Sequence, residues 1–589
     1  MSGATTPVRI RPPDARSDTL RRAALAALAL LVLNAALSFR NWWPTPAVLP
    51  DYKIAPEFVL LWLALLFAAW RRVRLSPRTL AVASLVYLVL VIGRYGDVTI
   101  PGLFGRDINL YWDVPQIPRF LWVSGRELPW WISAGAIAAL AALLAILYRL
   151  LRWAMGIAAN VAAPYAVGAR WTWVATLVTT GAAVAHVANV APDTTWRFVA
   201  KPVASTYWRQ ATLLTTAWTP SALADALPHA RALEVAIAAP PAESLASLHG
   251  RDVKLFFLES YGAMVFDDAD VSRTLARARE ALVADIAASG RLVASAFVRS
   301  PTFAGASDLA HLSLLSGIDL GDPRRHDLLL TTDRPTLVTL FARAGYQTVG
   351  LYPAVSWDWP ERGFYGFDLY VEGRDLGYRG PALGYWKMPD QFSIARFEAL
   401  HPLRADSPPR FLFFPTITSH LPFAPVPPYQ PDWDRLLTSE PFDPAEAERL
   451  ARARVDWIDM RPGYAGMIDY TYRWLGGYLR RPEPRESVIV LVGDHQPASS
   501  VSGAGASWDV PVHVVTRDPA LLARFVALGF RPGFEPRRPT LGGLHELNAM
   551  LLHAFGRGGS GDRAGWGGVA PGGDDRPKGV REPRATKDG

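Results

Sequence analysis

Long apolar runs occupy much of the first 191 residues of this 589-residue chain and constrain its fold more than any other feature. A helix needs roughly 20 apolar residues to cross a bilayer, so runs of this kind predict membrane-spanning helices. Five runs stand out, over residues 23–39, 54–70, 79–93, 128–148 and 171–190. The second and third are short and could form one hairpin that does not insert, which would leave three spans. We expect an N-terminal bundle of about five transmembrane helices over residues 23–191.

Arginines between the runs indicate the orientation of this bundle. The loop RRVRLSPR has four arginines in eight residues, and the loop between the last two runs contains Arg149, Arg152 and Arg170 without an acidic residue. Basic loops face the cytoplasm. The first run could instead be a signal peptide, but further runs follow it and no small-residue cleavage site does. We therefore expect a multi-pass protein of the cell inner membrane, with a cytoplasmic tail over residues 1–22 and a periplasmic C-terminal part.

The composition excludes several kinds of chemistry. The chain contains no cysteine, which rules out disulfides, thiolate metal ligands and thiol catalysis. Any metal must therefore be held by histidine, carboxylate or hydroxyl groups. The net charge of +8 comes from arginines that we expect at membrane edges and on the solvated surface. Since no basic stripe alternates with aromatic residues, we expect no nucleic-acid partner.

Three further parts follow the apolar runs. Residues 192–245 are rich in proline and should form a linker that either lies along the membrane surface or simply connects two domains. Residues 246–556 have the composition of a soluble domain and should form the extracytoplasmic catalytic part. Residues 557–589 are rich in glycine, aspartate and arginine without apolar periodicity, which predicts a disordered tail.

Short apolar runs alternate with amphipathic stretches from residue 252 onwards. This alternation predicts an α/β domain with a mostly parallel central sheet and helices on both faces. The expected strands are VKLFFLES, VASAFV, YQTVGLYP, RFLFFPTI, SVIVLVGD and VPVHVVT. The expected helices cover residues 271–288, 307–316, 336–344 and 464–479.

Polar residues directly follow two of these predicted strands. Glu259 follows the apolar run in FFLESYG, and Asp494 and His495 follow the run in VIVLVGDHQP. Between them, the loop SPTFAGAS leads into a helix, so we expect Ser307 at its N-cap. Parallel strands place their carboxyl ends at one edge, where carboxylates and an imidazole around a hydroxyl suit a metal-assisted nucleophile. The simpler alternatives are a serine that only caps its helix and polar strand ends with a structural role.

The order of the motifs carries a resemblance to a known family. FFLESYG, SPTFAGASD, TITSHLPF, YAGMIDY and VGDHQP, behind the apolar runs, resemble the membrane-anchored branch of the alkaline phosphatase superfamily. Lipoteichoic acid synthases, periplasmic glucan phosphoglycerol transferases and lipid A phosphoethanolamine transferases belong to this branch. The resemblance implies an alkaline phosphatase/sulfatase-like domain with one divalent metal, zinc or manganese. Its ligands would be Glu259, Ser307, Asp494 and His495.

The resemblance also implies residues on the substrate side. His420 in TSHLPF matches the histidine that binds phosphate or shuttles the acceptor proton in this branch. Trp357, Trp359 and Arg362 fall where lipoteichoic acid synthases present a tryptophan and an arginine to the phosphoglycerol group, although the spacing differs by one residue. Two other side chains are candidate additional ligands, namely Asp390 and His513.

The implied reaction transfers a phospho-alcohol head group, phosphoglycerol or phosphoethanolamine, from a phospholipid donor to an envelope glycan or lipid acceptor. It would pass through a phosphoserine at Ser307. One alternative is a phosphodiesterase, phosphatase or sulfatase-type hydrolase of the same superfamily. The other is a catalytically inactive, membrane-anchored glycan-binding protein.

Several positions depart from the family patterns. Leu309 and His311 stand where a sulfatase proper needs proline and arginine after its nucleophile, which disfavours sulfate ester hydrolysis. Ala306 stands where a threonine commonly precedes the nucleophile, and Gln496 stands where glycine commonly follows the Asp-His pair. The phosphoethanolamine branch has several cysteine pairs, so their absence favours the phosphoglycerol side.

Overall fold

The computed structural model forms two compact units, one of Met1–Leu103 with Asp107–Trp218 and one of Phe104–Arg106 with Thr219–Gly589. The residues it describes are 15–42, 45–104, 130–168, 199–217, 227–330, 332–355, 362–404 and 406–557, together with five isolated positions between 108 and 181. The predicted tail 557–589 lies outside them except for Arg557, and the predicted cytoplasmic tail 1–22 is described only from residue 15.

Apolar helices make up the first unit. Its described helices are α1 (Ala15–Ser38), α2 (Pro56–Trp70), α3 (Pro77–Phe104), α5 (Trp130–Gly168) and α7 (Val203–Ala217), with a short hairpin of β1 (Arg40–Asn41) and β2 (Val48–Leu49). Three segments are long and apolar enough to cross a membrane, Leu20–Ser38, Pro77–Pro101 and Trp130–Ala162, and α2 is a shorter apolar helix. The predicted helical bundle is therefore confirmed. The fifth expected run, 171–190, lies outside the described residues except for Leu177 and Gly181.

Two of the observed helices are much longer than the apolar runs that predicted them. The run 79–93 lies within α3, which has 28 residues, and the run 128–148 corresponds to α5, which has 39 residues. Both helices continue through polar and glycine-containing sequence that hydropathy alone reads as loop. Helices α1 and α2 pack on α5 through buried side chains such as Leu33, Leu66 and Leu151. Other apolar side chains of α5, such as Leu140 and Ile146, are exposed, as a lipid-facing surface requires.

Polar side chains hold α7 against the apolar helices. The Glu57 carboxylate at the start of α2 accepts a hydrogen bond from the Ala204 N–H at 2.9 Å. Thr206 donates to the Asp97 carboxylate of α3 at 2.8 Å. The linker predicted over residues 192–245 thus contains a helix that belongs to the first unit.

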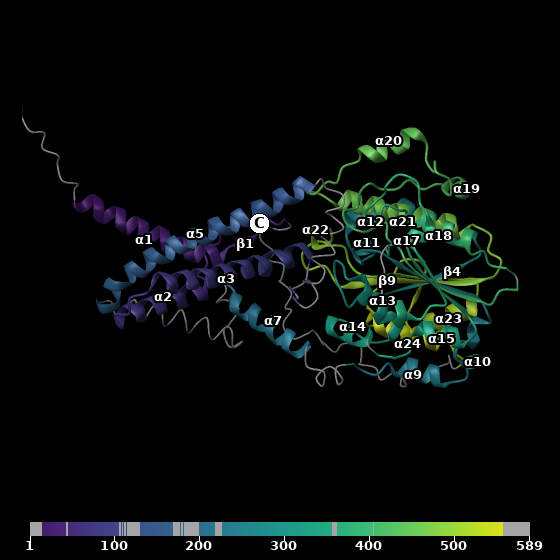
Figure 1. The fold of residues 1–589 in the computed structure, drawn as a ribbon. Helices are drawn as coiled ribbons and strands as arrows, with labels where there is room; N and C mark the ends of the chain where they lie inside the picture. Colours follow the sequence, from purple (N-terminus) through teal and green to yellow (C-terminus); the bar gives the residue numbers. More distant parts are fainter. Residues whose placement is uncertain are drawn as a thin grey trace, which may run out of the picture. The chain divides into compact units, whose positions relative to one another are not determined.

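An eight-stranded sheet organises the second unit, in the order β10-β4-β9-β8-β3-β7-β5-β6 (Figure 1). Neighbouring strands from β8 to β6 are parallel, β9 is antiparallel to both β8 and β4, and β10 is antiparallel to β4. The mostly parallel sheet is therefore confirmed. The strands are β3 (Asp252–Leu258), β4 (Leu292–Arg299), β5 (Gln347–Tyr352), β6 (Leu369–Glu372), β7 (Arg410–Pro415), β8 (Ser487–Gly493), β9 (Asp509–Thr516) and β10 (Arg531–Pro532).

Helices cover both faces of this sheet. Figure 1 shows α12 (Ala269–Ala288), α18 (Asp390–Leu400) and α21 (Arg461–Leu479) on one side of it. On the other side lie α13 (Ser307–Ser316), α15 (Leu337–Arg343), α23 (Pro519–Ala527) and α24 (Leu544–Phe555). The remaining short helices are α9 (Arg231–Ala238), α10 (Pro241–Ser244), η2 (Ala246–Leu248), α11 (Met264–Asp267), α14 (Pro323–Leu330), α16 (Arg362–Tyr365), α17 (Gly373–Leu376), α19 (Trp433–Leu436), α20 (Pro444–Arg452) and α22 (Ser499–Ser502).

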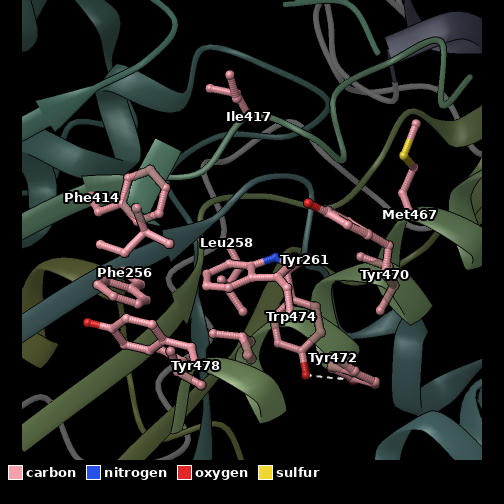
Figure 2. Close-up of a cluster of buried hydrophobic side chains, with 14 of the residues drawn as sticks. Phe256, Leu258, Tyr261, Phe414, Ile417, Met467, Tyr470, Tyr472, Trp474 and Tyr478 are labelled. Carbon is pink, nitrogen blue, oxygen red and sulfur yellow. Dashed lines mark hydrogen bonds between the residues drawn. The ribbon is translucent and has the colours of Figure 1, made fainter. Parts of the chain in front are cut away.

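An aromatic layer joins α21 to the centre of the sheet (Figure 2). Trp474 and Tyr478 of α21 pack against Phe256 of β3, and all three side chains are buried. The Tyr261 hydroxyl, just after β3, lies 2.8 Å from the Tyr472 hydroxyl, as the dashed line in Figure 2 marks. Burying large aromatic side chains in this way contributes several kcal/mol each to stability. This layer fixes the strand ends that carry the polar residues described next.

Candidate metal centre

The predicted metal ligands lie where three strands of the sheet end. Glu259 directly follows β3, Asp494 and His495 directly follow β8, and the loop after β4 leads to Ser307. Strand β4 runs in the same direction as β8, because each is antiparallel to β9 between them. Their carboxyl ends therefore meet at one edge, as expected for parallel strands.

Three side chains form a compact cluster at this edge. One ligand atom from each of Glu259, Asp494 and His495 lies within 4.8 Å of the others, and all three residues are buried. His495 Nε2 is 3.6 Å from Glu259 Oε1 and 3.5 Å from Asp494 Oδ2. The side chains predicted to ligate a metal are thus brought together, although Glu259 and Asp494 are more than two hundred residues apart in the sequence.

The fourth predicted ligand, Ser307, faces this cluster. Its Oγ is 3.2 Å from His495 Nε2 and 3.4 Å from Glu259 Oε2. The expectation that Ser307 caps its helix is wrong, because Ala306 occupies the N-cap and Ser307 is the first helical residue of α13. The hydroxyl thus makes no capping bond and is directed at the carboxylate and the imidazole instead.

The loop before Ser307 has an unusual backbone. Ala304, Gly305 and Ala306 have φ angles of 57°, 131° and 57°, in the left-handed region that favours glycine. Non-glycine residues in this region cost of order 1 kcal/mol each and persist where the surroundings fix them. Here, the Ala304 N–H donates to the carbonyl of Gln496, which ties the loop to the residue that follows the Asp-His pair. Such strain at a polar edge is typical of a functional loop.

Ser260 is a site residue that the sequence analysis missed. Its N–H donates to Asp494 Oδ1 at 2.8 Å, and its hydroxyl donates to Glu259 Oε1 at 2.9 Å. It reaches both carboxylates because its φ angle of 53° turns the chain sharply after Glu259. The one available signal was its position next to Glu259 at a strand end, which does not reveal this geometry.

Backbone contacts orient the imidazole. His495 Nδ1 donates to the carbonyl of Gln496 at 2.9 Å, which leaves Nε2 with a lone pair directed at the cluster. Asp494 Oδ1 accepts hydrogen bonds from the N–H groups of Ser260 and His495. This arrangement fixes the tautomer that a metal-binding histidine needs.

The cluster fits a divalent cation. Asp494 Oδ2 is buried and has no hydrogen-bond partner among the described residues. Burial and the neighbouring Asp494 raise the pKa of Glu259 well above its usual value. Two carboxylates, an imidazole nitrogen and a hydroxyl form a donor set that suits zinc or manganese. A cation between them would satisfy the unpaired oxygen and offset the repulsion of the two carboxylates.

His420 lies in the loop after β7, next to this edge. Its Nδ1 donates to the carbonyl of Leu421 at 2.6 Å, and its ring stacks on Tyr385 at 4.6 Å between centroids. Burial lowers the pKa of His420, so the ring is neutral near pH 7. The sequence analysis did not predict this stacking contact between His420 and Tyr385.

The two candidate additional ligands are not part of the cluster. Asp390 is fully buried, and its two oxygens accept the N–H groups of Ile417 and Thr418 at 2.7 and 3.1 Å. It therefore orders the chain between β7 and His420. His513 lies within β9, where Nδ1 contacts the Ser295 hydroxyl and Nε2 contacts the Tyr261 hydroxyl, at 2.7 and 3.1 Å.

The predicted substrate residue Arg362 lies beside the edge strand β6 of the sheet. Arg362 begins α16, and its half-exposed side chain is 3.5 Å from the buried carboxylate of Glu372, at the end of β6. Trp357 and Trp359 lie outside the described residues. His311, one turn after Ser307, is buried against Phe257 and Phe413, and burial lowers its pKa to about 4.

Comparison with protein families finds a similarity within this unit. A family model described as Sulfatase matches residues 313–516, which include Asp494 and His495 and begin after Ser307. The match confirms the predicted resemblance to the sulfatase-like enzymes of the alkaline phosphatase superfamily. A comparison with the sequences of curated proteins finds no significant match.

Solved structures show a distant similarity. The lipoteichoic acid synthase LtaP from Listeria monocytogenes is 13% identical, with 45% of this chain and 65% of that chain covered and a TM-score of 0.31. The phosphoglycerol transferase GacH from Streptococcus pyogenes is 11% identical, with 59% and 82% covered and a TM-score of 0.33. The periplasmic domain of EptC from Escherichia coli is 12% identical, with 52% and 80% covered and a TM-score of 0.32. The chain thus spans a little under two thirds of the LtaP structure.

Proposed function

We propose that this protein is a metal-dependent transferase that moves a phospho-alcohol head group from a phospholipid to an envelope glycan or lipid. The observation that supports this best is the position of Ser307 Oγ, within 3.4 Å of both Glu259 and His495 in an otherwise buried cluster. A hydroxyl held in this way is arranged for attack on an electrophile, with ligands for a cation beside it. The sulfatase match and the apolar helices support an enzyme of this superfamily anchored in a membrane.

Four residues would hold the metal, one zinc or manganese ion, namely Glu259, Ser307, Asp494 and His495. A cation bound there would make the serine hydroxyl a stronger nucleophile near neutral pH and would draw the phosphoryl oxygens toward the cluster. The first turn of α13 adds backbone N–H groups that favour a negatively charged phosphoryl group. These contributions would make Ser307, among the described serines, the one best placed for attack.

The reaction would proceed in two displacements. In the first, Ser307 Oγ loses its proton and bonds to the phosphorus of the head group, while the phosphorus–oxygen bond to diacylglycerol breaks and diacylglycerol takes up a proton. In the second, an acceptor hydroxyl gives its proton to a base and bonds to the same phosphorus, while the bond from phosphorus to Ser307 Oγ breaks and Oγ takes up a proton. His420 suits the second proton transfer, because its Nδ1 is engaged by Leu421 and its neutral Nε2 can accept a proton.

Phosphoglycerol is the head group that we favour over phosphoethanolamine, since the chain lacks the cysteine pairs of the phosphoethanolamine branch. Arg362 could bind the phosphate, but its ion pair with Glu372 would first have to open. We place the catalytic unit, residues 246–556, on the periplasmic side of the inner membrane, because the arginine-rich loops between the apolar runs favour the cytoplasm.

Hydrolysis is the principal alternative, because water in place of the acceptor hydroxyl would use the same residues. A catalytically inactive glycan-binding protein is the other alternative. Glycan binding does not explain why Asp494 Oδ2 is buried without a hydrogen-bond partner among the described residues, beside a serine and a histidine.

A donor labelled in its phosphate distinguishes these functions. Purified full-length protein in lipid discs receives phosphatidylglycerol labelled in this way, with zinc or manganese present, and is quenched in acid. We expect diacylglycerol release and label on the wild-type protein, but no label on Ser307→Ala. Ser313→Ala, on the same helix and away from the cluster, should still become labelled. Label released only as a soluble head group, even with envelope glycans present, would indicate a hydrolase. Full turnover by Ser307→Ala would rule out covalent catalysis by this residue.

A further inference from the structure

Two adjacent apolar side chains, Trp457 and Ile458, are strongly exposed on the second unit. Trp457 is 66% exposed and Ile458 is 95% exposed, more than any other large apolar side chain described in this unit. Scattered single apolar residues are normal on a protein surface. An adjacent tryptophan and isoleucine at the tip of a loop is less usual and points to a contact with an apolar partner.

Hydrogen bonds and core packing hold the loop that presents this pair. The Asp456 carboxylate accepts hydrogen bonds from the N–H groups of Ile458 and Asp459, at 2.9 and 3.0 Å. The Asp459 carboxylate in turn accepts the Arg461 N–H at 3.2 Å. Met460 packs against the main hydrophobic core. The backbone on both sides of the tip is therefore fixed, and the two side chains project outward because the loop directs them there.

This loop, residues 453–460, leads directly into α21 and hence to the candidate metal centre. Tyr464, seven residues after Trp457, donates to the carbonyl of Ser260 at 2.8 Å, next to the ligand Glu259. A Cβ on Gly463 would lie 2.8 Å from the carbonyl oxygen of Phe423, in the loop that contains His420. The exposed pair is thus connected, within two turns of helix, to the edge where the site residues meet.

One cation beside the tip, Arg454, suits a phospholipid surface. The acidic groups of Asp456 and Asp459 accept backbone N–H groups. Arg454 is exposed and pairs with no carboxylate among the described residues, since its Nη1 donates to the backbone carbonyls of Arg452 and Ala453. Tryptophan prefers the head-group region of a bilayer, and an arginine beside it attracts lipid phosphates.

We propose that Trp457 and Ile458 insert into the head-group region of the bilayer in which the apolar helices lie, with Arg454 against the lipid phosphates. A protein partner fits less well, because stable protein interfaces bury on the order of 1,200 Å² or more and two side chains offer far less. A bilayer needs no such area, since the membrane helices of the same chain keep the surface at a high effective concentration. The contact would hold the strand-end edge toward the layer that contains a phospholipid donor.

The absence of cysteine from the chain gives a direct test. Ile458→Cys in the full-length protein creates a single labelling site for an environment-sensitive fluorophore, and Val526→Cys on α23, 37% exposed, is the matched control. The labelled proteins are placed in phosphatidylcholine discs with and without phosphatidylglycerol. Quenching by nitroxide-labelled phospholipid is then compared with quenching by iodide in the water.

We expect the label at residue 458 to be quenched by the lipid nitroxide and protected from iodide, and the label at residue 526 to behave oppositely. Adding Arg454→Glu to Ile458→Cys should weaken the lipid quenching, most strongly in discs with phosphatidylglycerol. Iodide quenching at 458 equal to that at 526 would overturn the proposal. Protection from both quenchers would also overturn it, because it would indicate a protein contact such as a second copy of the chain. The inference rests on the proposed membrane attachment, and loss of the proposed transfer reaction would not alter this readout.

Discussion

Asp494→Asn should separate the two roles of a buried carboxylate. Its Oδ1 accepts two backbone N–H groups, whereas its Oδ2 has no hydrogen-bond partner among the described residues. An asparagine can keep both bonds of Oδ1 and removes one negative charge from beside Glu259. With a chelator present, we therefore expect the variant to be at least as stable as the wild type.

Bound metal should make the wild type more stable than Asp494→Asn. A ligand at one hundred times its Kd stabilises a folded protein by about 2.7 kcal/mol. For a unit of more than 300 residues, an unfolding entropy of about 2.1 cal/mol/K per residue makes 1 kcal/mol shift the thermal midpoint by about 1.5 °C, so saturating zinc or manganese should raise the wild-type midpoint by about 4 °C. Asp494→Asn should lose most of this shift because it removes a ligand. Thermal unfolding of the full-length protein, followed by circular dichroism with chelator and with each metal, measures both effects.

The dependence on pH gives a further check of the same prediction. A carboxyl group with a raised pKa in the folded state stabilises the protein fully below its unfolded pKa, and this contribution is lost as the pH rises through the folded value. The raised pKa of Glu259 therefore predicts that the metal-free wild type loses stability as the pH rises from about 4.5. Because Asp494 is one cause of that shift, the loss should be smaller in Asp494→Asn.

Asp390→Asn is the matched control, because Asp390 is also a fully buried aspartate beside a strand end. Both of its oxygens accept backbone N–H groups, so an amide nitrogen would face a donor and cost about 1–3 kcal/mol. We expect this loss with chelator and with metal alike, while the shift on adding metal remains. A full metal shift in Asp494→Asn, or none in the wild type with either metal, would refute the reasoning.

Two further predictions concern the fold around the site. Gly493→Ala should cost at least about 3 kcal/mol, because a Cβ there would overlap the carbonyl oxygen of Tyr261, whereas Gly363→Ala, with open space around it, should change the unfolding free energy by less than about 1 kcal/mol. Urea unfolding compares the two, and equal midpoints would contradict the prediction. Burial lowers the pKa of His513 to about 3, so its contribution to stability is present above pH 6.5 and lost as the pH falls, by about 2 kcal/mol between pH 6.5 and 5. His513→Gln should flatten this slope of unfolding free energy against pH, and an unchanged slope would assign the acid sensitivity to other groups.

The sequence predicted the members of the cluster because the direction of parallel strands is a strong rule. Glu259 and Asp494 each follow a continuous apolar run, and neighbouring parallel strands release their carboxyl ends at one edge. The same rule does not predict the order of the strands in the sheet. In the structure β3 and β8 are direct neighbours, which brings the two carboxylates close enough to bind one metal ion.

The residues that the sequence misplaced or missed depend on contacts that no local pattern shows. His513 lies within a strand, where it alternates with valines, whereas the ligands of the cluster follow strand ends. It contacts the hydroxyl groups of Ser295 and Tyr261. Ser260 reaches both carboxylates only through a left-handed backbone. The strands β6 and β10, with four and two residues, are too short for a periodic pattern, and packing against their neighbours defines them.

The site combines strained backbone angles with the repulsion between two buried carboxylates. A bound cation can reduce the repulsion but not the backbone strain. Ser260, Ala304 and Ala306 keep positive φ angles, which the surrounding structure must hold in place. The aromatic layer of α21 against β3 does so for Ser260, since Tyr464 of the same helix binds its carbonyl oxygen. Packing does not compensate the electrostatic repulsion between the Glu259 and Asp494 carboxylates in the same way. We therefore expect chelation to leave the shape of the loops unchanged while it lowers stability through the charges, and this difference is what Asp494→Asn isolates.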